Sequence, residues 1–201
     1  KLSPAPDSEK LLAGKSERSE RNLPGGPLIE EVIRTRLEKS ESIAVMHIEL
    51  AGLQEYNDEY GWTMGDLVIH LLAKTSMDVV AESGEPDDCV GHIRADNFVV
   101  VTRPARAPQL AQEIIKRFDA AIPEYYSEEA RQRRYIDGMD RRGNPYRQLL
   151  AAVKIAVVTN ERHPLEHPLQ IQALAREVLN YLKLWPGSSY MVDQRHKWDG
   201  G

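Results

Sequence analysis

The chain has 201 residues, which is long enough for one well-cored domain and gives no reason to expect two. Its 41% hydrophobic and 28% charged residues are typical of a globular protein, and no apolar run approaches the roughly 18 residues that span a bilayer. The formal net charge of −5 and the lack of a basic stripe argue against a nucleic-acid partner. The polar first residues show no secretory leader, so we expect a cytoplasmic location and no membrane segment.

The two ends of the chain differ in composition from its middle. Residues 1–22 are rich in Ser, Glu, Lys and Pro without apolar periodicity, which predicts a linker or disordered tail. We expect one domain over 23–195 and a short C-terminal tail over 196–201. Because residue 1 is not Met, we also expect the full-length protein to continue upstream.

The first half of the chain alternates helical and strand patterns. Apolar residues at helical spacing predict an amphipathic helix that begins at Pro27. A buried strand follows over 42–50 and ends in an acid, and a short helix is expected over 53–60. A long helix then continues until Gly84 and Pro86 end it.

Two hairpins and two helices are expected in the second half. The first hairpin covers 90–101 and is followed by a helix through Leu110–Phe118. The second hairpin turns around Arg142-Gly143-Asn144, and its second strand is predicted to run on through 149–159. A helix over 171–182 and a last strand over 188–193 close the domain. Hairpins mixed with helical crossovers predict an α+β fold, with a central, mainly antiparallel sheet flanked by helices.

Two acids are candidates for a shared site in such a sheet. Glu49 ends the first strand and Asp96 lies at the tip of the first hairpin. Carboxylates that converge at neighbouring strand ends suit a Mg²⁺–nucleotide site, because hard cations take oxygen ligands and screen phosphate charge. Acids at strand ends are usually only solvated, so this pairing alone is a weak signal.

The sequence around these acids resembles the GGDEF family of diguanylate cyclases, in particular a subgroup whose hairpin reads GHIGGDDF. The matching segments include "IELAGLQEYNDEYGWTMGDLVI" (48–69) and "VGHIRADNFVVV" (90–101), and the resemblance covers roughly 22–195. It implies a palm-type sheet shared with nucleotidyl cyclases and polymerases. It also implies a homodimer that condenses two GTP into cyclic di-GMP with Mg²⁺, and a sensory or receiver domain upstream.

The resemblance divides the expected site into two halves. Asn57 and Asp66, the base half, match the family's guanine-reading Asn and Asp, and an amide and a carboxylate suit the edge of a guanine. In the phosphate half, the Leu50 carbonyl and Asp96 match metal ligands, and Glu49 stands where the family has a metal-binding Asp, which keeps the charge but reaches about one methylene further. Lys183 matches the lysine that meets the terminal phosphates, although the arginine that follows in many members is absent.

The hairpin tip departs from the family pattern. Gly-Gly-Asp-Glu/Asp is replaced by Arg94-Ala95-Asp96-Asn97, so two glycines and one acid are lost. Glycines allow positive φ and close approach of a phosphate, and Asn97 supplies no negative charge to a metal. Loss of such a group typically costs about 10² to 10⁴ in rate, so we expect the catalytic role of Asp96 and Asn97 to be absent or vestigial. Arg94 either binds a phosphate or a carboxylate, or points into solvent.

The sequence is compatible with three functions. The first is a degenerate domain that binds GTP or a related nucleotide, with Mg²⁺ if nucleotide is bound, and acts as a regulatory or sensory module. The second is a slow diguanylate cyclase, and the third is a protein-interaction or dimerisation domain without nucleotide. Glu85 replaces the arginine of the family's Arg-x-x-Asp inhibitory motif while Asp88 remains, which makes cyclic di-GMP binding there doubtful.

Overall fold

The computed structural model describes residues 23–139, 142–161 and 165–195. Its centre is a five-stranded sheet in the order β2-β3-β1-β6-β7. The strands are β1 (Ala44–Ala51), β2 (Cys89–Arg94), β3 (Asn97–Thr102), β6 (Ala152–Thr159) and β7 (Ser189–Val192). All neighbours pair antiparallel except β6 and β7, which pair parallel.

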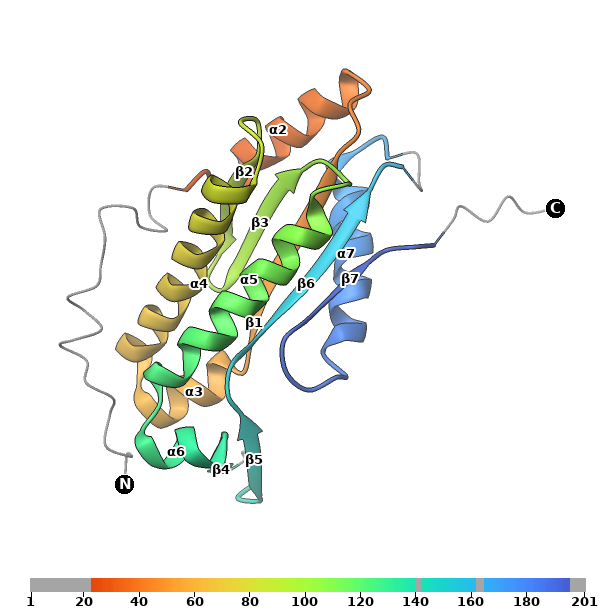
Figure 1. Cartoon of the computed structure of the whole chain (residues 1–201). Coiled ribbons are helices and arrows are strands. Elements are labelled where there is room, and N and C mark those ends of the chain that lie inside the picture. The colour runs from red at the N-terminus through yellow and green to blue at the C-terminus, as the bar shows by residue number, and fades with distance from the viewer. Residues whose placement is uncertain (1–22, 140–141, 162–164, 196–201) are drawn as a thin grey trace.

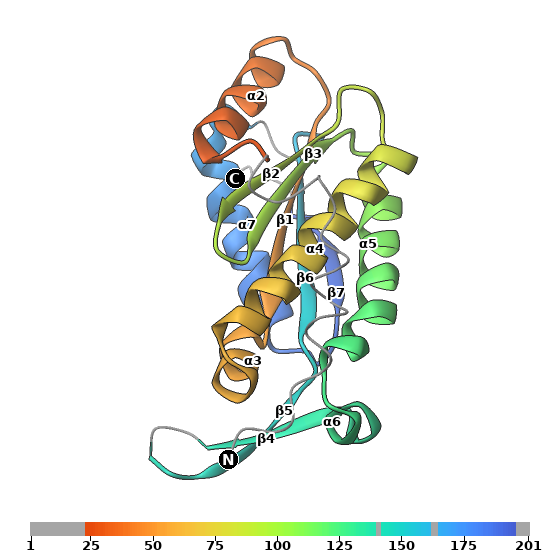
Figure 2. The same ribbon diagram turned by 90° about the vertical axis from the view of Figure 1, so that its left-hand side faces the viewer.

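Helices cover both faces of this sheet, as Figures 1 and 2 show. One face packs against α4 (Trp62–Ser83) and α5 (Ala107–Ala121), and the other against α2 (Gly26–Glu38) and α7 (Pro168–Leu182). Alternation along β1 explains the two cores, since Met46 and Ile48 enter the first and Val45 enters the second. The predicted α+β fold with a mainly antiparallel sheet is confirmed.

The strand register brings polar residues together at one end of the sheet. Glu49 of β1 lies opposite Asn97 of β3 on one side and Lys154 of β6 on the other. Directly opposite residues of antiparallel strands project to the same face of a sheet. Glu49 therefore lies between an amide and a cation on the face that α7 covers.

The polar stretch after α5 folds into elements that the sequence pattern did not predict. It contains a 3₁₀ helix, η2 (Ile122–Tyr125), and the helix α6 (Glu128–Arg133). Next come β4 (Tyr135–Met139) and β5 (Pro145–Leu149), which form a separate two-stranded sheet that extends from one end of the molecule (Figure 1). The expected turn residues 142–144 lie in the connection between these strands.

The prediction of one continuous strand over 149–159 was wrong. The chain leaves the small sheet at Leu149 and enters the large sheet at Ala152. The backbone N–H of Ala151 donates to the hydroxyl of the buried Tyr126 at 2.7 Å, so a side chain takes the place of a ladder partner at the break. Apolar composition alone does not reveal this interruption.

The expected tails over 1–22 and 196–201 lie outside the described residues, so the predicted domain limits remain predictions. Among the described residues, no helix is long and apolar enough to cross a membrane.

Candidate functional site

The end of β1 and the tip of the β2–β3 hairpin meet, as the position of the two acids suggested. The Leu50 N–H donates to the Asp96 carbonyl at 3.4 Å, which ties the strand end to the hairpin. The pKa of Asp96 is raised, first by partial burial and then by the nearby negative charge of Glu49. The Leu50 side chain is buried in the core, which leaves only its backbone for the site.

The tip of the hairpin, residues 94–97, keeps a backbone shape that favours glycine although it contains none. Ala95 has a φ of 41°, in the left-handed region, where a residue with a Cβ costs roughly 1–2 kcal/mol. The His92 ring holds the turn, because its Nε2 donates to the Ala95 carbonyl at 2.7 Å and the ring stacks on Phe98 at 4.6 Å. Ala95 therefore adopts a strained turn while placing a methyl group at its tip.

Both carboxylates of the phosphate half are already engaged within the protein. Lys183, the C-cap residue of α7, forms an ion pair with Glu49 at 2.7 Å. The Asn97 amide donates to Asp96 at 2.8 Å. Glu49 is 20% exposed and Lys183 is 43% exposed, so the pair lies at the surface of the site rather than deep in the core.

These residues do not fit a resident Mg²⁺ ion. Magnesium usually takes one or two carboxylates and completes an octahedral shell with water and phosphate oxygens. Here Lys183 pairs with the Glu49 carboxylate and the Asn97 amide donates to Asp96, so neither acid is free to take that role. No group of three or more His, Cys, Asp or Glu side chains that could hold a metal occurs among the described residues.

The base half lies between α3 (Leu53–Tyr60) and α4. Asn57 is buried, and its side-chain oxygen has no hydrogen-bond partner. A Cβ on Gly65 would lie 1.7 Å from that oxygen, so the glycine makes room for the amide. Asp66 follows Gly65 in α4 and is exposed. The packing of α3 on α4 thus places the unpartnered oxygen of Asn57 against Gly65, the residue before the exposed Asp66.

The β1–α3 turn adds a feature that sequence reasoning missed. Gly52 adopts a φ of 84° and is the N-cap of α3, where no side chain caps the helix. Backbone N–H groups at a helix N-terminus favour negatively charged ligands. The Ala-Gly pair at 51–52, directly after a buried strand, was the available sequence signal for this turn.

A buried lysine was missed as well. Lys154 is 2% exposed, and its Nζ donates to the carbonyls of Trp185 and Gly187 and to the Ser189 hydroxyl. Burial lowers the pKa of Lys154. These contacts hold the segment that follows Lys183. A single cation inside the apolar run over 149–159 was the signal that could have revealed it.

An acid, Glu85, stands where the resemblance implies the arginine of the Arg-x-x-Asp inhibitory motif, so the charge at this position is reversed. Glu85 forms an ion pair with Arg103 at 2.9 Å and lies 3.7 Å from Arg106. One carboxylate oxygen of Asp88 accepts from the Glu85 N–H at 2.9 Å and from the Thr102 hydroxyl at 2.8 Å, so it stabilises the turn.

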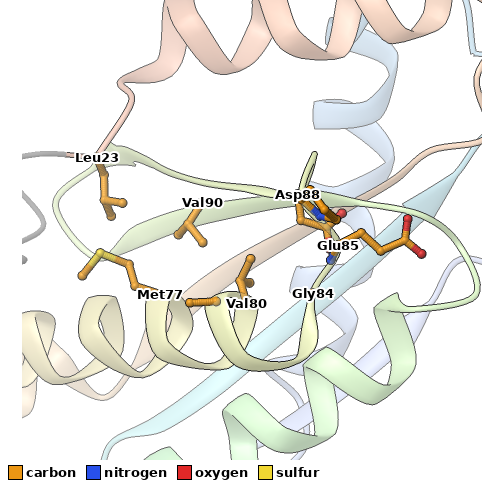
Figure 3. Close-up of a pocket in the computed structure, with 9 residues that line it drawn as sticks. Leu23, Met77, Val80, Gly84, Glu85, Asp88 and Val90 are labelled. Carbon is orange, nitrogen blue, oxygen red and sulfur yellow. Dashed lines mark hydrogen bonds between the residues drawn. The ribbon is translucent and has the colours of Figure 1, made fainter.

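A cavity of about 490 Å³ adjoins this slot. Figure 3 shows Leu23, Met77, Val80 and Val90 gathered along its apolar side, with the Glu85 side chain pointing away from them. No cation lines it among the residues that the structure describes. An anionic ligand would meet apolar and acidic groups there.

Comparison with known proteins identifies the fold and its family. Residues 27–138 match the family model "Diguanylate cyclase, GGDEF domain". The chain is 27% identical over 92 residues to the bifunctional diguanylate cyclase/cyclic di-GMP phosphodiesterase MucR of Pseudomonas aeruginosa. That match covers 44% of this chain and 13% of MucR, so the chain corresponds to a small part of that relative.

Solved structures show the same fold. The GGDEF domain of YfiN (TpbB) from Pseudomonas aeruginosa superposes with a TM-score of 0.63 at 19% identity, covering 88% of this chain and 94% of that one. The active GGEEF domain of a Vibrio cholerae diguanylate cyclase gives 0.61 at 16% identity, covering 84% and 94%. The GGDEF domain of DgcB from Caulobacter crescentus, in complex with c-di-GMP, gives 0.58 at 13% identity, covering 90% and 98%.

Proposed function

The chain belongs to the diguanylate cyclase GGDEF family, and we propose that it is a degenerate member that binds a guanine nucleotide and does not cyclise it. In this proposal it serves as a regulatory module in cyclic di-GMP signalling. The occupied or empty state of its nucleotide site is passed to a domain attached in the full-length protein. The family relation supports the signalling context, and the contacts of the site support the loss of catalysis.

The Glu49–Lys183 ion pair carries the most weight. A cyclase must place a metal ion against free carboxylates at the end of β1, and here a cation of the protein already neutralises Glu49 at 2.7 Å. Asn97 adds no charge and instead donates to Asp96 at 2.8 Å. Phosphoryl transfer depends on positioning and charge stabilisation, so a site whose acids are paired internally lacks the main catalytic contribution.

Nucleotide binding is supported by the base half. A buried amide oxygen without a partner costs free energy, which a ligand donor recovers once the Asn57 amide turns out from its packing against Gly65. Guanine presents N–H donors, so the oxygen of Asn57 and the accessible carboxylate of Asp66 offer matching acceptors. The uncapped N-terminus of α3, at the end of β1, favours the negative charge of the phosphates.

Calorimetry with GTP tests the binding proposal. We expect saturable binding of GTP to the purified chain and weaker binding of ATP, because adenine does not present the same donors to Asn57 and Asp66. Asn57→Ala should weaken GTP binding by about tenfold. Asn144→Ala, in the connection between β4 and β5, is the matched control. Absence of heat and of a thermal shift at millimolar GTP would instead indicate an interaction domain without nucleotide.

Product analysis tests the loss of catalysis. After long incubation of the chain with GTP and Mg²⁺, chromatography should show no cyclic di-GMP above a no-enzyme control. Product above that control would establish a slow cyclase and overturn the regulatory proposal. The two experiments are independent, since binding without turnover is the expected combination.

A further inference from the structure

A second pocket lies beside the phosphate half, between α7 and the β2–β3 hairpin. It has a volume of about 630 Å³. Its polar lining includes His47, Glu49, Arg94, Asn97, Arg176 and Lys183. Three of these side chains are cations at neutral pH and one is an acid. The cations come from both walls, with Arg94 on the hairpin and Arg176 and Lys183 on or next to α7.

The two arginines of this pocket are not neutralised within the protein. Lys183 is paired with Glu49, but neither Arg94 nor Arg176 forms an ion pair or hydrogen bond with any of the described residues. By contrast, Arg117 bonds both Glu82 and Glu113, and Arg195 bonds both Glu177 and Asp193. The pocket therefore keeps two unpaired guanidinium groups.

The rest of the lining supports a polar anion. Burial lowers the pKa of His47 to about 4, so at neutral pH its ring is an uncharged polar group and does not add to the positive charge. Asn180 contributes an amide from α7, and Asn97 contributes one from the hairpin. A guanidinium binds phosphate oxygens through two parallel N–H donors, which gives both affinity and orientation.

A bound phosphate needs positive charge beside it. The acids of this site are poorly placed to hold a Mg²⁺ ion that would supply that charge. Glu49 faces Lys183 rather than an open coordination position. We infer that the pocket between α7 and the hairpin binds a phosphate-bearing ligand without a metal ion, with Arg94 and Arg176 supplying the positive charge. This inference rests on the proposed function, because the phosphates are taken to be those of a nucleotide bound at the base half. Arg94 and Arg176 are then the residues that bind them.

Pyrophosphate is the probe that tests this inference directly. Titration of the chain by calorimetry should show binding in EDTA that Mg²⁺ does not strengthen. Arg94→Gln and Arg176→Gln should each weaken it by about tenfold, the effect of removing one charge-assisted hydrogen bond. Arg147→Gln is the matched control, because Arg147 lies on β5 in the small sheet and its side chain is 72% exposed. The Arg147→Gln variant should bind pyrophosphate with the same affinity as the wild type.

Three outcomes would overturn the inference. They are the absence of pyrophosphate binding at millimolar concentration, a strict requirement for Mg²⁺, and affinity unchanged by both arginine substitutions. Circular dichroism of each variant separates lost binding from lost folding, and Arg176→Lys, which keeps the charge, should retain more affinity than Arg176→Gln.

The same titrations distinguish this inference from the proposed function. If GTP binds with Mg²⁺ while pyrophosphate does not bind at all, the nucleotide proposal stands and the metal-free pocket is overturned. If pyrophosphate binds as tightly as GTP and Asn57→Ala affects neither, the pocket stands and the nucleotide proposal is overturned. Loss of GTP but not pyrophosphate affinity in Asn57→Ala supports both, and identifies the phosphates as those of a nucleotide.

Discussion

The base half and the phosphate half of this site are built in different ways. The base half lies between two packed helices and offers an acceptor that nothing in the protein satisfies. The phosphate half lies where a strand end meets a hairpin, and its acids are paired with a lysine and an amide of the same chain. Hydrogen-bonding recognition needs only an unpaired group in a shaped space, whereas metal-dependent chemistry needs free negative charge. Under the proposed function, the changes in the phosphate half remove the chemistry and leave the recognition of the base.

The sharpest way to break this contrast is to rebuild the hairpin. The triple variant Arg94→Gly, Ala95→Gly and Asn97→Asp restores clearance for a phosphate and adds a carboxylate opposite Glu49. We expect cyclic di-GMP to appear at about 10²-fold above the no-enzyme control, at the low end of what an acid or metal group contributes. Metal-free pyrophosphate binding should fall in the same variant, because one of the two arginines is gone.

The double variant Arg94→Gly and Ala95→Gly is the matched control for the rebuilt hairpin. It restores clearance without charge, so turnover should stay at the wild-type level. An equal gain in the double and triple variants would mean that charge is not what the site lacks. No gain in either would place the main defect elsewhere, with the Glu49–Lys183 pair as the next residues to change.

A second test removes the support under the phosphate half. In Lys154→Met the carbonyls of Trp185 and Gly187 lose a buried charged donor, and leaving such acceptors unsatisfied should lower the free energy of unfolding by about 2–3 kcal/mol. The segment after Lys183 should loosen, so pyrophosphate affinity should fall while the base half is unaffected. Denaturant titration and calorimetry measure the two effects, with Lys116→Met on the exposed face of α5 as control. Unchanged stability would show that Lys154 does not hold this segment.

A third test perturbs only the base half. The methyl group of Gly65→Ala would collide with the Asn57 amide, and the collision is relieved if that side chain rotates away. We expect GTP affinity to fall by about tenfold and pyrophosphate affinity to stay constant. Gly25→Ala is the control, because a Cβ there meets nothing within 4 Å. Equal loss for both ligands would show that the two halves are not separable.

Most of the fold followed from local patterns in the sequence, because amphipathic spacing marks helices and apolar runs mark strands. The break at Ala151 did not, since it depends on the Tyr126 hydroxyl, which accepts from the Ala151 N–H and lies 25 residues away in sequence. The same is true of the site. The meeting of Glu49 and Asp96 could be expected from strand ends, whereas the Glu49–Lys183 pair joins residues whose distance apart no local pattern encodes.

The smallest expected effect concerns the electrostatic cost of the charged Asp96 in the phosphate half. The pKa of Asp96 is raised in the folded state by partial burial and by the charge of Glu49. The folded state thus binds the Asp96 proton more tightly than the unfolded state does. The resulting stabilisation is present at low pH and is lost as pH rises through the raised pKa.

Asp96→Asn removes the cost of the charged carboxylate and keeps an oxygen that accepts from Asn97. At pH 7 the variant should therefore be more stable by less than about 1 kcal/mol, given solvent screening. The difference should vanish below about pH 3, where the carboxyl is protonated in both states. Thermal unfolding across this pH range, with the exposed Asp58→Asn as control, measures it. A wild type more stable than Asp96→Asn at pH 7 would show that the hydrogen bond from Asn97 outweighs the cost of holding the charged Asp96, partly buried, beside Glu49.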